Sequence, residues 1–172
     1  ITVCAGLSAT LNASGAVSYA WNNGVTNATP FFPSTTATYT VVGTDVNGCQ
    51  NQDQVVVNVL PQPIVLGGLD QTICAGTPII LNASTTSATP TAVTGFQWSN
   101  NVPNNTQYVP TNSATLTVTA TGANGCTNQD QILVTVLALP TVNAGQDITV
   151  CAGLSATLNA SGAVSYAWNN GV

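Results

Sequence analysis

Residues 1–25 read ITVCAGLSATLNASGAVSYAWNNGV, and residues 148–172 repeat them letter for letter. Within the stretch apolar side chains recur at every second position, as at Val17, Tyr19 and Trp21. Such alternation is typical of a half-buried β-strand. The duplication fixes a period of 147 residues. It indicates a tandem array, of which we expect this chain to be a window of about one period.

Each period contains two diverged copies of one unit. Cys4 corresponds to Cys74 at an offset of 70 residues, and Trp21 corresponds to Trp98 at an offset of 77. The difference is an insertion near residues 85–91. We therefore predict unit 1 at residues 1–61, without its first strand, and unit 2 at residues 62–139. A truncated copy of unit 1 is expected at residues 140–172.

The remaining chain has the same strand pattern and no helical one. Thr and Val are enriched, and Gly, Pro and Asn interrupt the apolar runs. Asn47-Gly48 and Asn124-Gly125 predict type I′ hairpin turns, and Asn23-Gly24 and Asn170-Gly171 predict further turns. Each unit thus reads as six or seven short antiparallel strands. The predicted fold class is all-β, with tandem immunoglobulin-like sandwiches of about 70–77 residues.

Short proline-containing joints connect the units. Residues 60–63 read LPQP and residues 137–140 read LALP, with no flexible Gly/Ser tract. Because proline restricts φ, we expect semi-rigid joints and hence a rod.

The charge inventory excludes several functions. The chain has no Lys, Arg or His, and its only acidic residues are five aspartates. A basic surface for nucleic acid cannot form, since phosphate neutralisation needs Lys or Arg. No His, Lys or Glu is available to activate a Ser or Thr nucleophile. The matched carboxylates Asp53 and Asp130 lie one in each unit, too far apart for paired acid/base work, so we expect no enzymatic activity. No apolar run is long enough to predict membrane insertion of this segment.

Two cysteines stand at matched places in each unit. On that basis we predict intra-unit disulfides Cys4–Cys49 and Cys74–Cys126, with Cys151 unpaired by truncation. Disulfides indicate an oxidising compartment outside the cytoplasm. The alternative is that the cysteines are reduced and buried.

Several motifs together resemble a known family of repeats. They are PTVNAGQDITVCAG at residues 140–153, LNAS, a Trp strand followed by NGV, TATYTV, and NGC before a Val-rich final strand. The succession is similar to the Ig-like (PKD-like) repeats of large secreted Bacteroidota surface adhesins. The resemblance covers essentially the whole chain. It implies export by type IX secretion, display at the cell surface and, in some relatives, a part in gliding motility.

We expect no cofactor, and calcium is the alternative. Asp45 lies in a turn with Asn47, and Asp70 and Asp147 each lie beside a joint, where oxygen-rich sites can hold calcium. No complete calcium-loop motif is present. The competing interpretation gives Asp70 and Asp147 a place in Asx turns.

Two functions remain open. The leading hypothesis is a non-catalytic structural segment of an extracellular filament or adhesin stalk, whose partners are neighbouring repeat units or laterally packed filaments. The alternative is an adhesive module that binds a glycan or a surface through loops such as residues 85–91. Tyr19 and Trp21 are expected in the core rather than in a sugar platform. Of Phe31 and Phe32, one is expected to be exposed.

Overall fold

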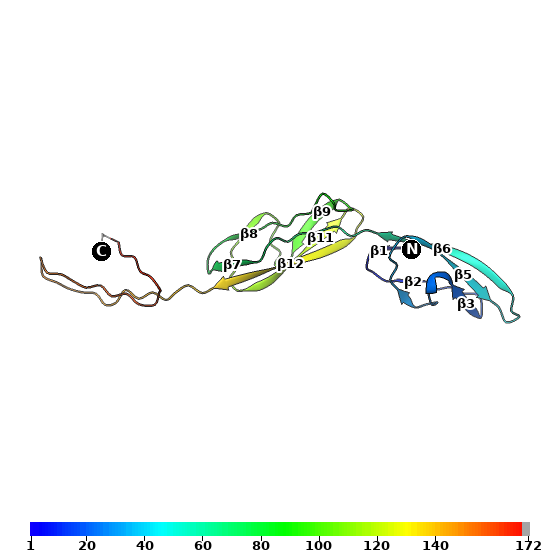
Figure 1. The fold of residues 1–172 in the computed structure, drawn as a ribbon, viewed down its shortest axis with the longest axis horizontal. Coiled ribbons are helices and arrows are strands. Elements are labelled where there is room, and N and C mark those ends of the chain that lie inside the picture. The colour runs from blue at the N-terminus through cyan, green and yellow to red at the C-terminus, as the bar shows by residue number, and fades with distance from the viewer. Residues whose placement is uncertain (170–172) are drawn as a thin grey trace.

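The computed structural model describes residues 1–169, and the predicted turn at Asn170-Gly171 lies outside them. The chain is elongated, with two β-sandwiches end to end and a trailing C-terminal segment (Figure 1). The first sandwich contains β1 (Thr2–Cys4), β2 (Ala9–Thr10), β3 (Ser18–Trp21), the 3-10 turn η1 (Asn22–Gly24), β4 (Pro30–Phe31), β5 (Ala37–Thr44) and β6 (Gln50–Leu60). The second contains β7 (Gln71–Cys74), β8 (Ile79–Leu81), β9 (Val93–Trp98), β10 (Thr106–Tyr108), β11 (Ala114–Gly122) and β12 (Thr127–Leu137).

Both sandwiches have the same topology. In unit 1 a sheet of order β1-β6-β5-β3 faces a smaller sheet of β2 and β4, and in unit 2 a sheet of order β7-β12-β11-β9 faces β8 and β10. The prediction of all-β, Ig-like sandwiches is therefore confirmed. The expectation that all strands are antiparallel is wrong, because β1 pairs parallel with β6 and β7 pairs parallel with β12. The first strand of each unit thus lies against the carboxyl-terminal half of the last.

The core of unit 2 is the larger. Its cluster has ten buried hydrophobic residues, including Trp98 at 1% exposure, whereas the cluster of unit 1 has five and leaves Trp21 only partly buried. Both tryptophans face the core, as predicted for Trp21. Tyr19 lies outside the core cluster of unit 1, contrary to the prediction, and its hydroxyl bonds the backbone of Ala16. Of the paired phenylalanines, Phe31 packs against Tyr39 and Phe32 is 73% exposed.

One asparagine in each unit ties the tryptophan to the opposite sheet. In unit 2 the Asn104 Oδ1 accepts from the Trp98 indole N–H at 3.1 Å and from the Ala83 N–H at 2.7 Å, while its Nδ2 donates to the Ala83 carbonyl at 2.9 Å. Asn27 makes the same three contacts in unit 1. These partly buried amides satisfy the polar edge of the core.

The hairpin turns differ from the predicted type I′. The φ angle is positive at Gly48 (81°) and Gly125 (82°) but not at the preceding asparagines, whereas type I′ needs positive φ at both central residues. Instead the Gly48 N–H donates to the Asp45 carbonyl, and the Asp45 N–H donates to the Cys49 carbonyl. This is a type I turn closed by a left-handed glycine, a common longer hairpin loop.

Residues 140–169 form no strand within the described chain. One isolated bridge joins Asn143 to Ser161. This bridge repeats, 77 residues on, the Leu66–Ser84 bridge of unit 2. Residues 140–169 therefore form this one bridge of the sandwich fold but none of its strands.

Candidate functional site at the joint

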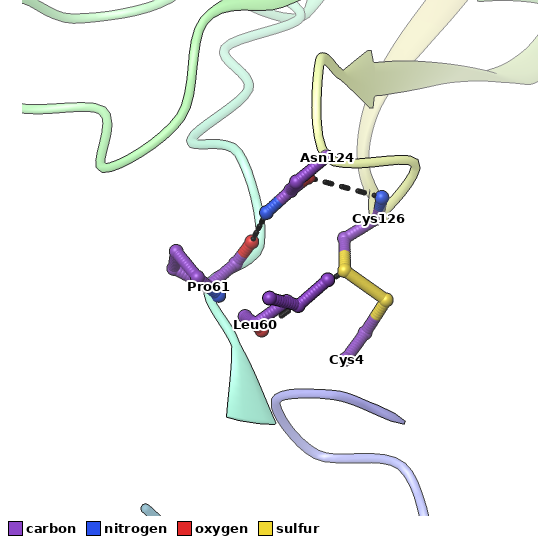
Figure 2. Close-up of a disulfide and its surroundings, with 5 residues drawn as sticks. All are labelled: Cys4, Leu60, Pro61, Asn124 and Cys126. Atoms are coloured by element: carbon purple, nitrogen blue, oxygen red, sulfur yellow. Dashed lines mark hydrogen bonds between the residues drawn. A yellow bond between two sulfur atoms is a disulfide. The ribbon is translucent and has the colours of Figure 1, made fainter. Parts of the chain in front are cut away.

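The feature with the clearest consequence is a disulfide between the two units. Cys4 is bonded to Cys126, across a sequence separation of 122 residues and a Cα–Cα distance of 5.7 Å (Figure 2). Cys49 and Cys74 are free and exposed, as is Cys151. The predicted intra-unit pairs Cys4–Cys49 and Cys74–Cys126 are therefore wrong.

The parallel pairing of the first strand explains this correction. Cys4 lies opposite Leu60, at the end of β6, whereas Cys49 lies in the turn before β6 begins. An 11-residue strand spans roughly 35 Å at about 3.3 Å per residue. Disulfide bonding needs Cα atoms within about 7 Å, so the two cysteines of one unit cannot meet. Cys126, in the corresponding turn of unit 2, is brought instead to the end of unit 1.

Asparagine side chains of unit 2 hold the chain at the joint. The Asn124 Nδ2 donates to the Pro61 carbonyl at 2.7 Å, while its Oδ1 accepts from the Cys126 N–H at 3.1 Å (Figure 2). Asn128 donates from Nδ2 to the Pro63 carbonyl at 3.0 Å. Cys126 is fully buried at this contact. The joint therefore combines one covalent bond with hydrogen bonds to two linker carbonyls, as a rigid connection requires.

The linker continues as an integral part of unit 2. Val65 is buried in its core, and Leu66 exchanges two backbone hydrogen bonds of 2.9 Å with Ser84. The Gly67 N–H donates to the Asp130 carboxylate at 2.8 Å, and Asp70 accepts from the Leu133 N–H at 2.8 Å. We name residues 63–70 the leading segment of unit 2.

The insertion at residues 85–91 lies against this leading segment. The Ile64 N–H donates to the Thr89 Oγ1 at 3.0 Å, and the Thr85 hydroxyl donates to the Ile64 carbonyl at 2.7 Å. The insertion has no aromatic residue. Its hydrogen bonds hold Ile64 of the leading segment against unit 2.

Unit 1 has a groove where unit 2 carries its leading segment. The groove runs beside Leu11, Val41, Asp53 and Val55. The counterparts of Val41, Val55 and Asp53 in unit 2 are Val118, Ile132 and Asp130, the side chains nearest to Gly67. A partly apolar surface is thus open on unit 1, whereas the leading segment covers its counterpart on unit 2.

Backbone hydrogen bonds determine the electrostatics of two aspartates. N–H groups of Cys49 and Asn47 hold the pKa of the Asp45 carboxyl below its usual range. N–H groups of Gly67 and Gln131 lower the pKa of Asp130 in the same way. Both carboxylates therefore serve as acceptors for turns and for the leading segment.

The three candidate calcium residues do not come together. Asp45 lies in the distal turn of unit 1, Asp70 accepts from the backbone of β12, and Asp147 lies in the exposed segment after unit 2. Within residues 1–169 no three carboxylate, thiol or imidazole groups are close enough to share a metal ion. The expectation of no metal, with calcium as its alternative, stays a prediction.

No family model and no curated protein matches the sequence. Among solved structures, the chain is similar to the N-terminal eight Ig domains of the Down syndrome cell adhesion molecule, at 18% identity and a TM-score of 0.39, covering 94% of this chain and 31% of that one. It is also similar to Ig domains 1–4 of Sidekick-1, at 14% identity and a TM-score of 0.35, covering 85% of this chain and 51% of that one. The chain thus spans a third to a half of these proteins. At such identities the likeness concerns the fold alone.

No helix in the described part of the chain is long and apolar enough to cross a bilayer.

Proposed function

We propose that this chain is a non-catalytic structural segment of an extracellular filament or of an adhesin stalk. Its units hold a terminal domain away from the cell surface, and residues 140–172 begin the next copy of unit 1. The observation that carries the proposal is the Cys4–Cys126 disulfide, because it restrains one unit against the next rather than stabilising either one.

The remaining contacts of the joint support the same function. Asn124 and Asn128 fix the linker to unit 2, and the leading segment contributes Val65 to its core. A linker held in this way transmits bending and tension from unit to unit. The two sandwiches lie end to end, as a spacer requires (Figure 1).

The disulfide supports the proposed compartment, and the sequence resemblance supports the proposed origin. A disulfide that closes a joint persists only in an oxidising environment, which supports an extracellular location. The residue pattern that resembles Bacteroidota adhesin repeats supports a type IX secreted parent, with gliding motility as one setting. The chain has no His, Lys or Glu, and the matched aspartates Asp53 and Asp130 lie one in each unit, which supports a non-catalytic role.

Small-angle scattering of the oxidised and the reduced protein tests this proposal. We expect the oxidised chain to have one well-defined maximum dimension, that of units in line. Reduction should lower the average maximum dimension and widen its spread among molecules, because the joint then bends about residues 61–62. Identical profiles before and after reduction would contradict the role of the disulfide.

A glycan array separates the stalk from the adhesive alternative. We expect no binding, since the exposed aromatic Phe32 of unit 1 has no aromatic partner on the insertion of unit 2. Specific binding that is lost on replacing residues 85–91 would assign adhesion to the repeats themselves.

A further inference from the structure

We propose that Cys49 and Cys74 are the two halves of a second kind of disulfide joint. In the array, Cys74 of unit 2 bonds the counterpart of Cys49 in the unit that follows. Every boundary between units then carries one disulfide, and the rod is covalently cross-linked along its whole length. The inference rests on the proposed array, but it is independent of what the rod displays.

Cys74 occupies the place in unit 2 that Cys4 occupies in unit 1. Cys4 lies opposite Leu60 in the parallel pair β1–β6, and Cys74 lies opposite Leu137 in the pair β7–β12. The next residue also matches, since the Ala5 N–H donates to Leu60 and the Ala75 N–H donates to Leu137, both at 2.8 Å. Cys74 is therefore presented at the far end of unit 2, exposed, as Cys4 is presented at the joint.

Cys49 occupies the place in unit 1 that Cys126 occupies in unit 2. Each follows an Asn-Gly turn with a left-handed glycine, before the longest strand of its unit. The two turns are also closed by the same backbone hydrogen bond. The Asp45 N–H donates to the Cys49 carbonyl, and the Gly122 N–H donates to the Cys126 carbonyl. Cys49 is thus the receiving half of a joint, on the end of unit 1 away from unit 2.

The asparagines that hold the linker are repeated as well. Asn124 and Asn128 bind the Pro61 and Pro63 carbonyls, and they correspond to Asn47 and Asn51 of unit 1. The carbonyls that these side chains would bind after unit 2 are those of Ala138 and Pro140. Ala138 replaces Pro61, but the contact uses only the carbonyl oxygen. The second joint therefore has the cysteine pair and both linker contacts of the first.

The leading segments keep the features that fix them to a sandwich. Val65 of unit 2 is buried in its core, and its counterpart at the second joint is Val142. The Leu66–Ser84 bridge also has a counterpart, between Asn143 and Ser161. Residues 140–147 therefore have the features of a leading segment before a unit of type 1, which places Cys74 and the Cys49 counterpart at one joint.

Formation of the bond needs an oxidant, and a small-molecule disulfide such as oxidised glutathione supplies it. The Cys74 thiolate attacks one sulfur of that disulfide and releases one small thiol, giving a mixed disulfide. The Cys49-type thiolate then attacks the Cys74 sulfur and releases the second thiol. Two protein thiols thus lose two electrons and two protons, and the oxidant becomes two thiols.

The experiment uses the full chain with residues 26–61 appended after Val172. Because residues 148–172 are identical to residues 1–25, the addition completes a third unit with the sequence of unit 1. Cys49→Ser is introduced in the first unit only, so that the appended copy of Cys49 is distinguishable. The protein is refolded in a glutathione buffer, alkylated, and digested without reduction. Chymotrypsin and an Asp-specific protease serve, since the chain has no Lys or Arg for trypsin.

We expect two linked peptide pairs, Cys4 with Cys126 and Cys74 with the appended copy of Cys49, and an alkylated Cys151. The Cys4–Cys126 pair is the internal control for oxidation. With that pair formed, an alkylated Cys74, or Cys74 joined to Cys151, would overturn the proposal. Cys151→Ser is the matched control and should leave both linkages unchanged. Failure here would leave the rod proposal intact, because scattering tests that proposal on the first joint.

Discussion

Units 1 and 2 share one topology but differ in how completely their cores are covered. Unit 2 includes its leading segment, which contributes Val65, and its core cluster contains ten buried residues. Unit 1 has a groove at the same place, and its cluster contains five. The difference shows that the segment between two units has two structural roles. It belongs to the joint and also completes the sandwich that follows.

Truncation of the tryptophans should show the largest difference between the units. Trp98→Ala is expected to destabilise unit 2 by about 3–5 kcal/mol, because it empties a fully buried site and removes one of the two N–H groups that donate to Asn104. Trp21→Ala should cost unit 1 less, since Trp21 is only partly buried. Hydrogen exchange resolved by peptide measures each unit separately. Equal losses in the two units would contradict the contrast in core coverage.

A leading segment placed before Ile1 should make unit 1 resemble unit 2. We expect residues 140–147, added in front of Ile1, to stabilise unit 1 by about 1.5–3 kcal/mol, chiefly through burial of the counterpart of Val142. The Ser14 N–H should become protected from exchange, because its counterpart Ser84 donates to Leu66.

The matched control for this addition carries serine at the Val142 counterpart. It should restore little of the stability while keeping the chain length the same. If both versions stabilise unit 1 equally, the apolar groove is not the binding surface.

Acid should weaken the leading segment of unit 2. Hydrogen bonds from Gly67 and Gln131 lower the pKa of Asp130 in the folded state, so its contribution is complete above the unfolded pKa of about 4. That contribution is lost as the pH falls through the folded pKa. The carboxylate is partly exposed to solvent, so the effect should stay below about 1 kcal/mol.

Asp130→Asn tests this dependence, with Asp53→Asn as the matched variant in unit 1. Thermal midpoints between pH 6 and pH 2.5 should fall less steeply for Asp130→Asn than for the unmodified chain. Asp53→Asn is the control for the substitution itself, because Asp53 accepts from the Gln54 N–H but lies beside the open groove, with no counterpart of the Gly67 N–H among the described residues. A larger effect from Asp53→Asn would contradict the role of Asp130 in the loss of stability at low pH.

Calcium should have the smallest effect. Asp45, Asp70 and Asp147 lie apart, and the first two already accept backbone hydrogen bonds. We therefore expect the same thermal midpoint in EDTA and in millimolar calcium. A rise of several degrees with calcium would restore the metal hypothesis.

Much of the fold could be predicted from the sequence. Alternation identified the strands, and the matched tryptophans identified the cores. The pairing of cysteines could not be predicted by matching units, because the match gives each unit two cysteines without saying at which end they lie. That depends on the parallel placement of β1 on β6, a long-range contact. Asn27 and Asn104 were overlooked for a similar reason, since their partners are the tryptophan and the opposite sheet.

The duplicated residues show the limit of local prediction. Residues 1–22 include β1, β2 and β3, whereas the identical residues 148–169 form no strand in the described chain. The strands of unit 1 exist because β5 and β6 pair with β3 and β1 and because β4 pairs with β2. Sequence pattern therefore indicates which residues can form strands, and tertiary pairing decides which of them do.

Disulfide mapping of the 172-residue chain tests the central claim most directly. The protein is refolded in a glutathione buffer, alkylated, and digested with chymotrypsin and an Asp-specific protease without reduction. The account predicts one linked pair, Cys4 with Cys126, and alkylated Cys49, Cys74 and Cys151. Recovery of Cys4 with Cys49 and of Cys74 with Cys126 would contradict it, because the units would then be closed on themselves and the joint left unlocked.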